Sequence, residues 1–227
     1  MVKVSNAQNM RILQLVPVII LVSLVGMACS TADSSSRASN VLFSDDFSNN
    51  NKNWDQVSNS SGSTDYYNAA YRIIVNATNF NVWAKPGKES FVDTRIEVDA
   101  TKSNGPDDNE FGVICRYLDA SRFYYAAISS DGYYVIMKMT NAGSASIGEA
   151  SMLESDKIIK GAVTNHLRFD CVGTTLTLYV NGSQVDQQSD ADYTTGNVGL
   201  LCGTFRTPGT DIVFDNFFVY KPGAAVQ

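Results

Sequence analysis

Histidine is the residue type that this chain most nearly lacks, because His166 is the only one in 227 residues. A catalytic triad needs a histidine oriented against a nucleophile, and no serine or cysteine motif stands beside His166 in the sequence. Glycine-rich phosphate loops and zinc-ligand spacings are also missing. No recognisable catalytic motif of these kinds remains, and we interpret His166 as a partly exposed residue at the start of a strand.

Positive charge is scarce as well. The chain has 17 Lys and Arg against 23 Asp and Glu, which gives a net charge of −6 and a pI of about 4.7. The basic residues are scattered along the chain, whereas phosphate binding needs them gathered in a patch. The composition therefore excludes nucleic acid as a partner.

Helical periodicity is absent beyond residue 40, where the apolar residues recur with a period of two. Turn sequences such as Lys85-Pro86-Gly87, Ser130-Asp131-Gly132 and Asn181-Gly182 separate the alternating segments. This pattern predicts strands at 41–47, 71–75, 91–100, 111–117, 123–128, 133–139, 165–172, 175–180, 198–204 and 211–220. Ten or so short strands with hairpin turns favour an all-β, two-sheet antiparallel sandwich or jelly roll. We expect one domain over 41–221, a flexible tail at 222–227 and a monomer.

The first residues have the features of an export signal. Lys3 and Arg11 precede an apolar run over 12–25, and small residues lead to Cys29. The segment resembles a bacterial lipoprotein signal, although Gly26 stands where such signals usually have Leu. We predict a signal peptide at 1–28, lipidation of Cys29, a Ser-rich linker at 29–40, and an exported, membrane-anchored protein. An ordinary cleaved signal and an uncleaved anchor, which keeps the same outside topology, remain the alternatives.

Three further cysteines, Cys115, Cys171 and Cys202, each lie inside an apolar, strand-like run. No two of them have metal-ligand spacing. We favour three small buried apolar residues over a disulfide with one reactive thiol.

Several motifs resemble those of the concanavalin A-like lectin and glucanase jelly roll, and within it the laminin-G-like and 3-keto-disaccharide hydrolase-like domains. The resemblance extends over nearly all of residues 41–220. The motifs that carry it include Phe43-Ser44-Asp45-Asp46-Phe47, Asn109-Glu110-Phe111-Gly112-Val113, Tyr179-Val180-Asn181-Gly182 and Phe214-Asp215-Asn216-Phe217. The Asn-Gly hairpin is the strongest of them, since it suits the positive backbone dihedrals of a tight turn. Most of these residues specify a fold, so the resemblance implies a jelly roll more firmly than a function.

A catalytic pair of carboxylates is hard to assemble from the sequence. Glycoside hydrolysis needs two carboxyl groups at a fixed separation. Glu97 and Asp99 are two residues apart, but the glucanase members continue as Glu-x-Asp-x-x-Glu, and Lys102 occupies the third position here. We interpret the pair as part of a solvated charged face and predict that Glu97→Gln and Asp99→Asn leave any activity within a few-fold.

Two acidic groups are candidates for a structural Ca²⁺ or for sugar hydroxyls. Asp108 and Glu110 belong to a loop that follows Gly105-Pro106, and a solvated turn is an equally good explanation for this loop. Asp45 and Asp46 at the first strand and Asp215 at the last one form the candidate metal site, because the terminal strands of related sandwiches lie close together. A capping or salt-bridge role is the default for these three.

Aromatic residues point to a possible ligand surface, because a Tyr ring buries sugar C–H groups while its hydroxyl reaches polar atoms. Lys138 is costly to bury unpaired, and alternation places Tyr134 on the same face, so Tyr134 is expected to face solvent. Arg116 falls on the solvent face of its own strand by the same reasoning. We predict a ligand surface made of Arg116 and Tyr134, with Asp108 and Glu110 at its rim; aromatic pairs that only stabilise a sheet are the alternative.

Together these features favour a non-catalytic, lectin-like carbohydrate-binding module on the outside of the cell, whose partner is a glycan or another surface ligand. A glycoside hydrolase of the 3-keto-disaccharide hydrolase or glucanase type is the alternative, and a structural spacer is the third possibility.

Overall fold

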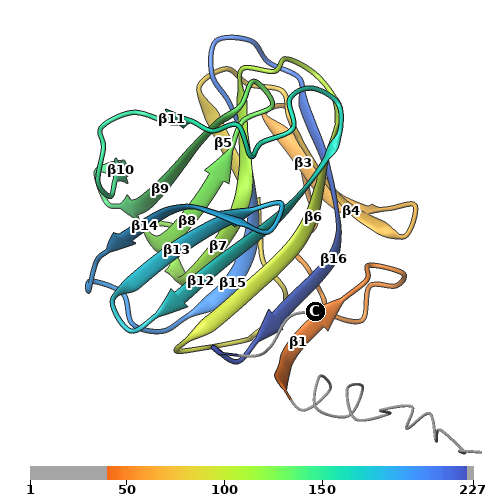
Figure 1. Cartoon of the computed structure of the whole chain (residues 1–227). Helices are drawn as coiled ribbons and strands as arrows, with labels where there is room; N and C mark the ends of the chain where they lie inside the picture. The colour runs from red at the N-terminus through yellow and green to blue at the C-terminus, as the bar shows by residue number, and fades with distance from the viewer. Residues whose placement is uncertain (1–39, 224–227) are drawn as a thin grey trace, which may run out of the picture.

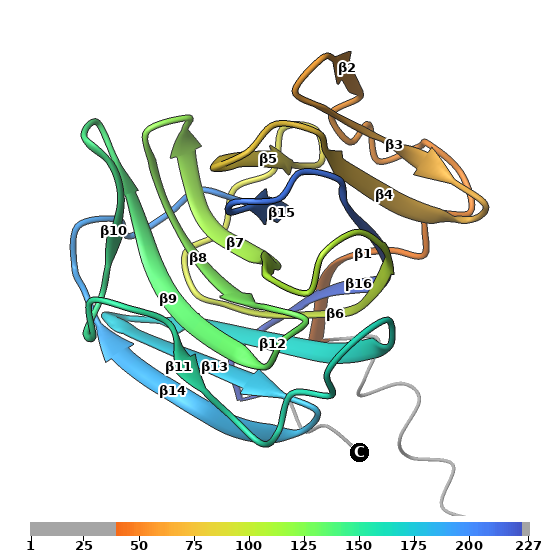
Figure 2. The ribbon, with the colours of Figure 1, turned by 90° about the horizontal axis from the view of Figure 1, so that it is seen from above.

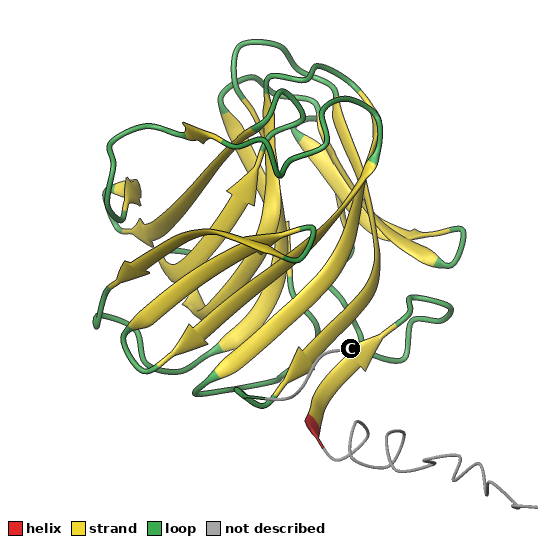
Figure 3. Ribbon diagram, in the orientation of Figure 1, coloured by secondary structure: helices red, strands yellow, loops and turns green. Residues whose placement is uncertain are grey.

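The computed structural model describes residues 40–223, in which sixteen β-strands form two antiparallel sheets (Figures 1 and 3). The sheets pack face to face as a jelly-roll sandwich, which confirms the fold expected from the alternation. The predicted signal peptide, Cys29 and most of the predicted linker and tail lie outside the described residues. Within residues 40–223, no helix has the length and apolar character needed to cross a membrane.

Sheet A has nine strands. Its order is β14 (Ser183–Ser189), β13 (Thr175–Val180), β12 (Thr164–Val172), β6 (Thr94–Asn104), β16 (Thr210–Tyr220), β4 (Ala70–Val75), β3 (Gly62–Tyr67) and β2 (Val57–Asn59), and β1 (Val41–Asp45) pairs with β16. The first and last strands are therefore neighbours, as expected.

Sheet B has seven strands and lies against one face of sheet A (Figure 2). Its order is β10 (Gly143–Ser146), β9 (Tyr133–Thr140), β8 (Arg122–Ile128), β7 (Asn109–Asp119), β15 (Asn197–Thr204) and β5 (Phe80–Ala84), and β11 (Leu153–Glu154) pairs with β9. Both β10 and β11 pair with β9, so the chain between them stays at this edge of the sheet.

The core lies between the two sheets and follows the period-two pattern of the strands. Ile96, Val98 and Ala100 of β6 are fully buried in it, and so are Phe111 and Val113 of β7. Val92 falls within the strand predicted at 91–100, but it precedes the start of β6 and is 63% exposed. The alternation thus identified the core-facing residues wherever the strand is regular.

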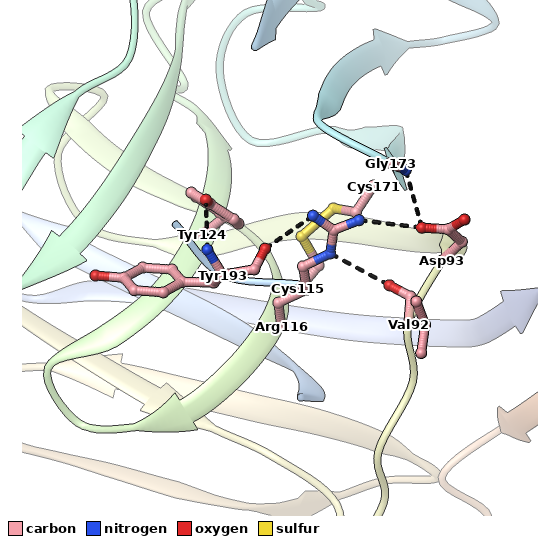
Figure 4. The surroundings of a disulfide bond; sticks show 8 residues. All are labelled: Val92, Asp93, Cys115, Arg116, Tyr124, Cys171, Gly173 and Tyr193. Atoms are coloured by element: carbon pink, nitrogen blue, oxygen red, sulfur yellow. Dashed lines mark hydrogen bonds and ion pairs between the residues drawn. A yellow bond between two sulfur atoms is a disulfide. The ribbon is translucent and has the colours of Figure 1, made fainter. Parts of the chain in front are cut away.

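A disulfide joins the two sheets, because Cys115 of β7 is bonded to Cys171 of β12 (Figure 4). The preference for three unpaired cysteines was therefore wrong. Each of the two strands turns its cysteine toward the core, and this brings the two sulfur atoms together across the sandwich. The third cysteine, Cys202, is fully buried and unpaired, and burial raises the pKa of its thiol well above the usual value. It is an unreactive core residue rather than an exposed thiol.

Candidate functional site

The face of sheet B that points away from sheet A has an apolar layer of its own, which we call the outer face of sheet B. Period-two alternation places residues of β5, β7, β8, β9 and β15 on it. The buried members are Ile114, Phe123, Tyr125, Ala127, Val135, Met139 and Leu201, and Trp83, Tyr117, Met137 and Met152 pack against them. An apolar layer outside the main core is where a ligand or another segment is expected to pack.

Two adjoining hollows open on this outer face, and we refer to them together as the groove. The first has a volume of about 260 Å³, and its lining includes Asn81, Glu110, Tyr125, Val135, Met137, Ser144, Ser146 and Met152. The second has a volume of about 580 Å³ and is lined by Asn79, Asp108, Ser129, Asp131, Tyr133, Ser151, Met152, Phe205 and Arg206. Ser151, Met152 and Phe205 line both hollows. The segment from β10 to β11 thus forms one wall of the groove.

Glu110 is the buried carboxyl group of the groove, with 6% of its surface exposed. Burial raises its pKa above the ordinary value, and a hydrogen bond with the Asn81 side chain acts in the opposite direction. The Tyr125 hydroxyl lies nearby and donates to Ser144 Oγ at 3.0 Å; burial, with the charge of Glu110 as a smaller cause, raises the pKa of Tyr125. The groove therefore combines polar groups with Met and aromatic walls, which is the composition of many small-molecule sites.

The structure brings two of the predicted ligand residues to this groove. Asp108 lines the larger hollow and Glu110 the smaller one. Their neighbours in the acidic loop have structural roles instead. Asp107 pairs with Lys102, and the buried Asn109 accepts from the Ser130 backbone N–H at 3.0 Å and donates to the Pro106 carbonyl at 2.6 Å.

Arg116 does not lie on the outer face, so the prediction that it forms part of a solvent-facing ligand surface is wrong. Its backbone has φ = 53°, and the pairing of β7 with β8 is interrupted after Cys115. This bulge turns the side chain into the end of the sandwich, where it is 2% exposed. The guanidinium donates to the carbonyls of Val92 and Tyr193 at 3.2 and 2.9 Å and pairs with Asp93 at 3.1 Å (Figure 4).

Tyr134 was also expected to face solvent, and it packs against the main core instead. Lys138, which shares the face of Tyr134, was expected to keep this face in solvent. The Lys138 ammonium reaches Asp190 and Asp192 at 2.5 and 2.6 Å at the edge of the sandwich, so it needs no solvent-facing position. The outer face of sheet B carries the alternate residues of β9, including Val135 and Met137.

Glu97 and Asp99 lie on sheet A, on the side opposite the core and away from the groove. Glu97 is paired with Arg95 at 2.5 Å. Asp99 Oδ1 lies 2.7 Å from His166 Nδ1, and Asp99 Oδ2 accepts from Asn216 Nδ2 at 3.0 Å. The pair therefore belongs to a charged network, but Glu97 and Arg95 are buried, so the solvated face expected from the sequence holds only for the partly exposed Asp99.

The candidate calcium ligands do not converge on one point. Asp45 is buried and accepts from Trp54 Nε1 and the Phe47 N–H, both at 2.9 Å, and burial raises its pKa. Asp46 instead accepts from the Ser48 hydroxyl at 2.7 Å, and Asp215 accepts from the Asn216 N–H at 2.7 Å. Among residues 40–223, no group of three His, Cys, Asp or Glu side chains is placed to hold a metal ion. These three aspartates serve as local caps, the default role.

Sequence reasoning missed several residues of the groove, above all Asn81, Tyr125, Met137 and Ser144. Asn81 belongs to β5, a strand that was not predicted, and Ser144 belongs to β10, whose sequence Gly-Ser-Ala-Ser has no apolar alternation. A signal for the β8 and β9 residues was present, because both faces of these strands are apolar. A strand that is apolar on both faces is buried on both sides, so this pattern indicates that the outer face of sheet B is also covered by packed residues.

The strand order and the two packed sheets define a concanavalin A-like jelly roll, as the sequence motifs implied. No protein-family model matches the chain. No curated protein matches it either.

Solved structures share the architecture at low sequence identity. Carbohydrate-binding module CBM66 from Bacillus subtilis has a TM-score of 0.60 and 18% identity over 74% of this chain and 95% of that one. The Bacillus licheniformis β-glucanase has 0.56 and 10%, over 79% and 97% of the two chains. A GH16 structure from the Bacteroides ovatus mixed linkage glucan PUL, in complex with G4G4G3G product, has 0.55 and 12%, over 79% and 100%. At these identities the likeness shows the fold, and function has to be argued from the groove.

Proposed function

We propose that the protein is an exported, lipid-anchored carbohydrate-binding module that binds a glycan in the groove without cleaving it. One observation carries the proposal: the smaller hollow combines a buried carboxyl and carboxamide, Glu110 and Asn81, with Tyr125 and methionine walls. Hydrogen-bonding groups among aromatic and apolar side chains match the mixed surface of a sugar ring. The similarity to a carbohydrate-binding module of the same fold supports this choice.

The positions of the carboxyl groups support binding without cleavage. Two carboxyl groups must flank the scissile bond in most glycoside hydrolases. Glu97 and Asp99 belong to a sheet A network and are engaged by Arg95 and His166. Glu110 is the only carboxylate among the residues that line the smaller hollow.

A glycoside hydrolase remains the second candidate, because one observation favours it. Glu110 is buried, which raises its pKa as a general acid requires, and a second carboxyl group, Asp108, lies two residues earlier in the sequence and lines the adjoining hollow.

A binding assay and a hydrolysis assay on the same samples test the proposal. The full chain in detergent is passed over immobilised neutral glycans, and each glycan that is retained is then incubated with the protein while released reducing ends are measured. Retention without release of reducing ends is the expected result. Hydrolysis that Asp108→Asn and Glu110→Gln each reduce by orders of magnitude would establish the enzyme instead.

A further inference from the structure

Gly203 leaves room for the two polar side chains of the groove, Asn81 and Glu110, to lie side by side. Gly203 of β15 is paired with Asn81 of β5 on one side and with Glu110 of β7 on the other. The three residues therefore form one cross-strand row on the outer face of sheet B. Asn81 and Glu110 lie two strands apart, and their side chains meet over the middle strand.

The meeting depends on the missing side chain. A Cβ atom at Gly203 would lie 2.4 Å from Asn81 Oδ1, 2.6 Å from Glu110 Cγ and 2.7 Å from Glu110 Oε1. All three of these atoms belong to the two polar side chains, and none belongs to the backbone. The space above Gly203 is thus filled by the carboxyl and carboxamide themselves, which fixes them side by side at the floor of the smaller hollow.

The surroundings of this pair are poor in compensating charge. No cation of residues 40–223 forms an ion pair with Glu110. The hydrogen bond with the Asn81 side chain is the one interaction that lowers the pKa of Glu110. By contrast, the equally buried Glu97 is paired with Arg95. A buried carboxyl group without a cation destabilises a fold, so a position of this kind is a candidate for a ligand contact. The hollow gives a ligand direct access to the pair, since both side chains line it.

We propose that Asn81 and Glu110, aligned by Gly203, form a subsite for two adjacent hydroxyl groups of a neutral sugar. This inference rests on the proposed function and names its ligand class. A carboxyl oxygen accepts from one hydroxyl, and the carboxamide donates to and accepts from the next. A uronic or sialic acid would bring an ionised carboxylate into the smaller hollow, whose lining includes no cation, and a buried charge without a partner is costly. A cationic amino sugar needs an ionised carboxylate, which burial disfavours.

Two variants test whether Asn81 and Glu110, and their alignment by Gly203, are needed for binding. Glu110→Met keeps the length of the side chain but removes both carboxyl oxygens. Gly203→Ala keeps both polar residues and pushes them apart. Thr177→Val is the control for a buried polar side chain on sheet A, and Gly87→Ala is the control for a glycine whose added Cβ would have no contact closer than 3.6 Å.

The experiment measures retention of the full chain on mixed-linkage β-glucan, β-1,3-glucan, galactomannan, polygalacturonate and chitosan. We expect retention on at least one of the three neutral polymers and little on polygalacturonate or chitosan. Glu110→Met and Gly203→Ala should each weaken binding to the retained neutral polymer at least tenfold, with melting temperatures that show folded protein. Both controls should bind like the wild type.

Two kinds of contrary result are distinguishable. Wild-type retention on a neutral polymer with both groove variants unchanged overturns the subsite and leaves the carbohydrate-binding function standing. Tighter binding to polygalacturonate or chitosan than to every neutral polymer also overturns the ligand class. Wild-type protein that none of the five polymers retains overturns the proposed function, and the subsite with it.

Discussion

Glu110 lies in the groove without a cationic partner among the described residues, and this has a consequence for stability. Burial raises its pKa in the folded protein, so between the ordinary value of 4.5 and the raised value the folded state binds more protons than the unfolded state. The free energy of unfolding must therefore fall as the pH rises through that window. We predict that Glu110→Gln removes this fall and stabilises the protein at neutral pH.

Thermal unfolding of both proteins at pH 4 and pH 7 checks this prediction. The melting temperature of Glu110→Gln relative to wild type should be higher at pH 7 than at pH 4, with a difference of about 2 to 4 °C for each kcal/mol. A variant that loses stability equally at both pH values would show that the carboxylate is compensated in the folded state.

Arg116 is a structural residue, and its replacement should be costly. Arg116→Ala leaves two carbonyls and Asp93 without their donor at the end of the sandwich. We expect a loss of about 3 kcal/mol, which is a melting temperature lower by roughly 6 to 12 °C. Arg122→Ala is the control, because its pair with Asp119 is exposed and its loss should leave the melting temperature nearly unchanged. Equal melting temperatures for the two variants would refute the structural role.

Individual side chains were predictable from the sequence only where a strand is regular. The buried face of β6 and β12 follows directly from alternation, as Ile96, Val98 and Leu167 show. The positions of Arg116 and Tyr134 could not be obtained this way. At Arg116, a bulge with positive φ reverses the alternation. On the face of Tyr134, Lys138 is paired with Asp190 and Asp192, which are distant in the sequence.

At the scale of elements, the disulfide ties β7 of sheet B to β12 of sheet A across 56 residues of sequence. A loop of that length predicts a stabilisation of about 4 kcal/mol through the unfolded state. The double variant Cys115→Ala, Cys171→Ala should therefore unfold at a markedly lower denaturant concentration than the wild type.

The control for the disulfide is Cys202, which is buried and unpaired. In the native protein a thiol reagent should label no cysteine among the described residues, and in denaturant it should label Cys202 there. Labelling of Cys115 or Cys171 in denatured, unreduced protein would contradict the pairing.

The strands that escaped prediction are those with weak alternation. β14 has the sequence Ser-Gln-Val-Asp-Gln-Gln-Ser and lies at the edge of sheet A, where polar residues are tolerated on both faces. β5 is a short edge strand of sheet B, yet it carries Asn81 and Trp83 of the outer face. The sequence therefore predicted only part of the groove, because β5, which carries Asn81, was not recognised as a strand.

At the scale of the whole molecule, the position of the membrane anchor stays a prediction from residues outside the described part of the chain. If Cys29 is acylated, the wild-type protein should partition into the detergent phase and Cys29→Ala should partition into the aqueous phase. Phase separation of cell extracts, with the mature N-terminus determined by sequencing, measures this. Partitioning that Cys29→Ala does not change would exclude the lipoprotein signal.

Tryptophan fluorescence tests whether the glycan binds on the outer face of sheet B. The chain has two tryptophans. Trp54 is 3% exposed and packs in the main core, whereas Trp83 lies on the outer face of sheet B, two residues along β5 from Asn81. A glycan in the groove should therefore change the emission of Trp83 alone.

The measurement is a titration of wild type and Trp83→Phe with a neutral glycan that the protein retains. We expect a saturable change in the emission of the wild type and none in Trp83→Phe, which the immobilised glycan should still retain. A saturable change of equal size in Trp83→Phe, or glycan binding that leaves the wild-type emission unaltered at saturation, would contradict the groove on the outer face of sheet B.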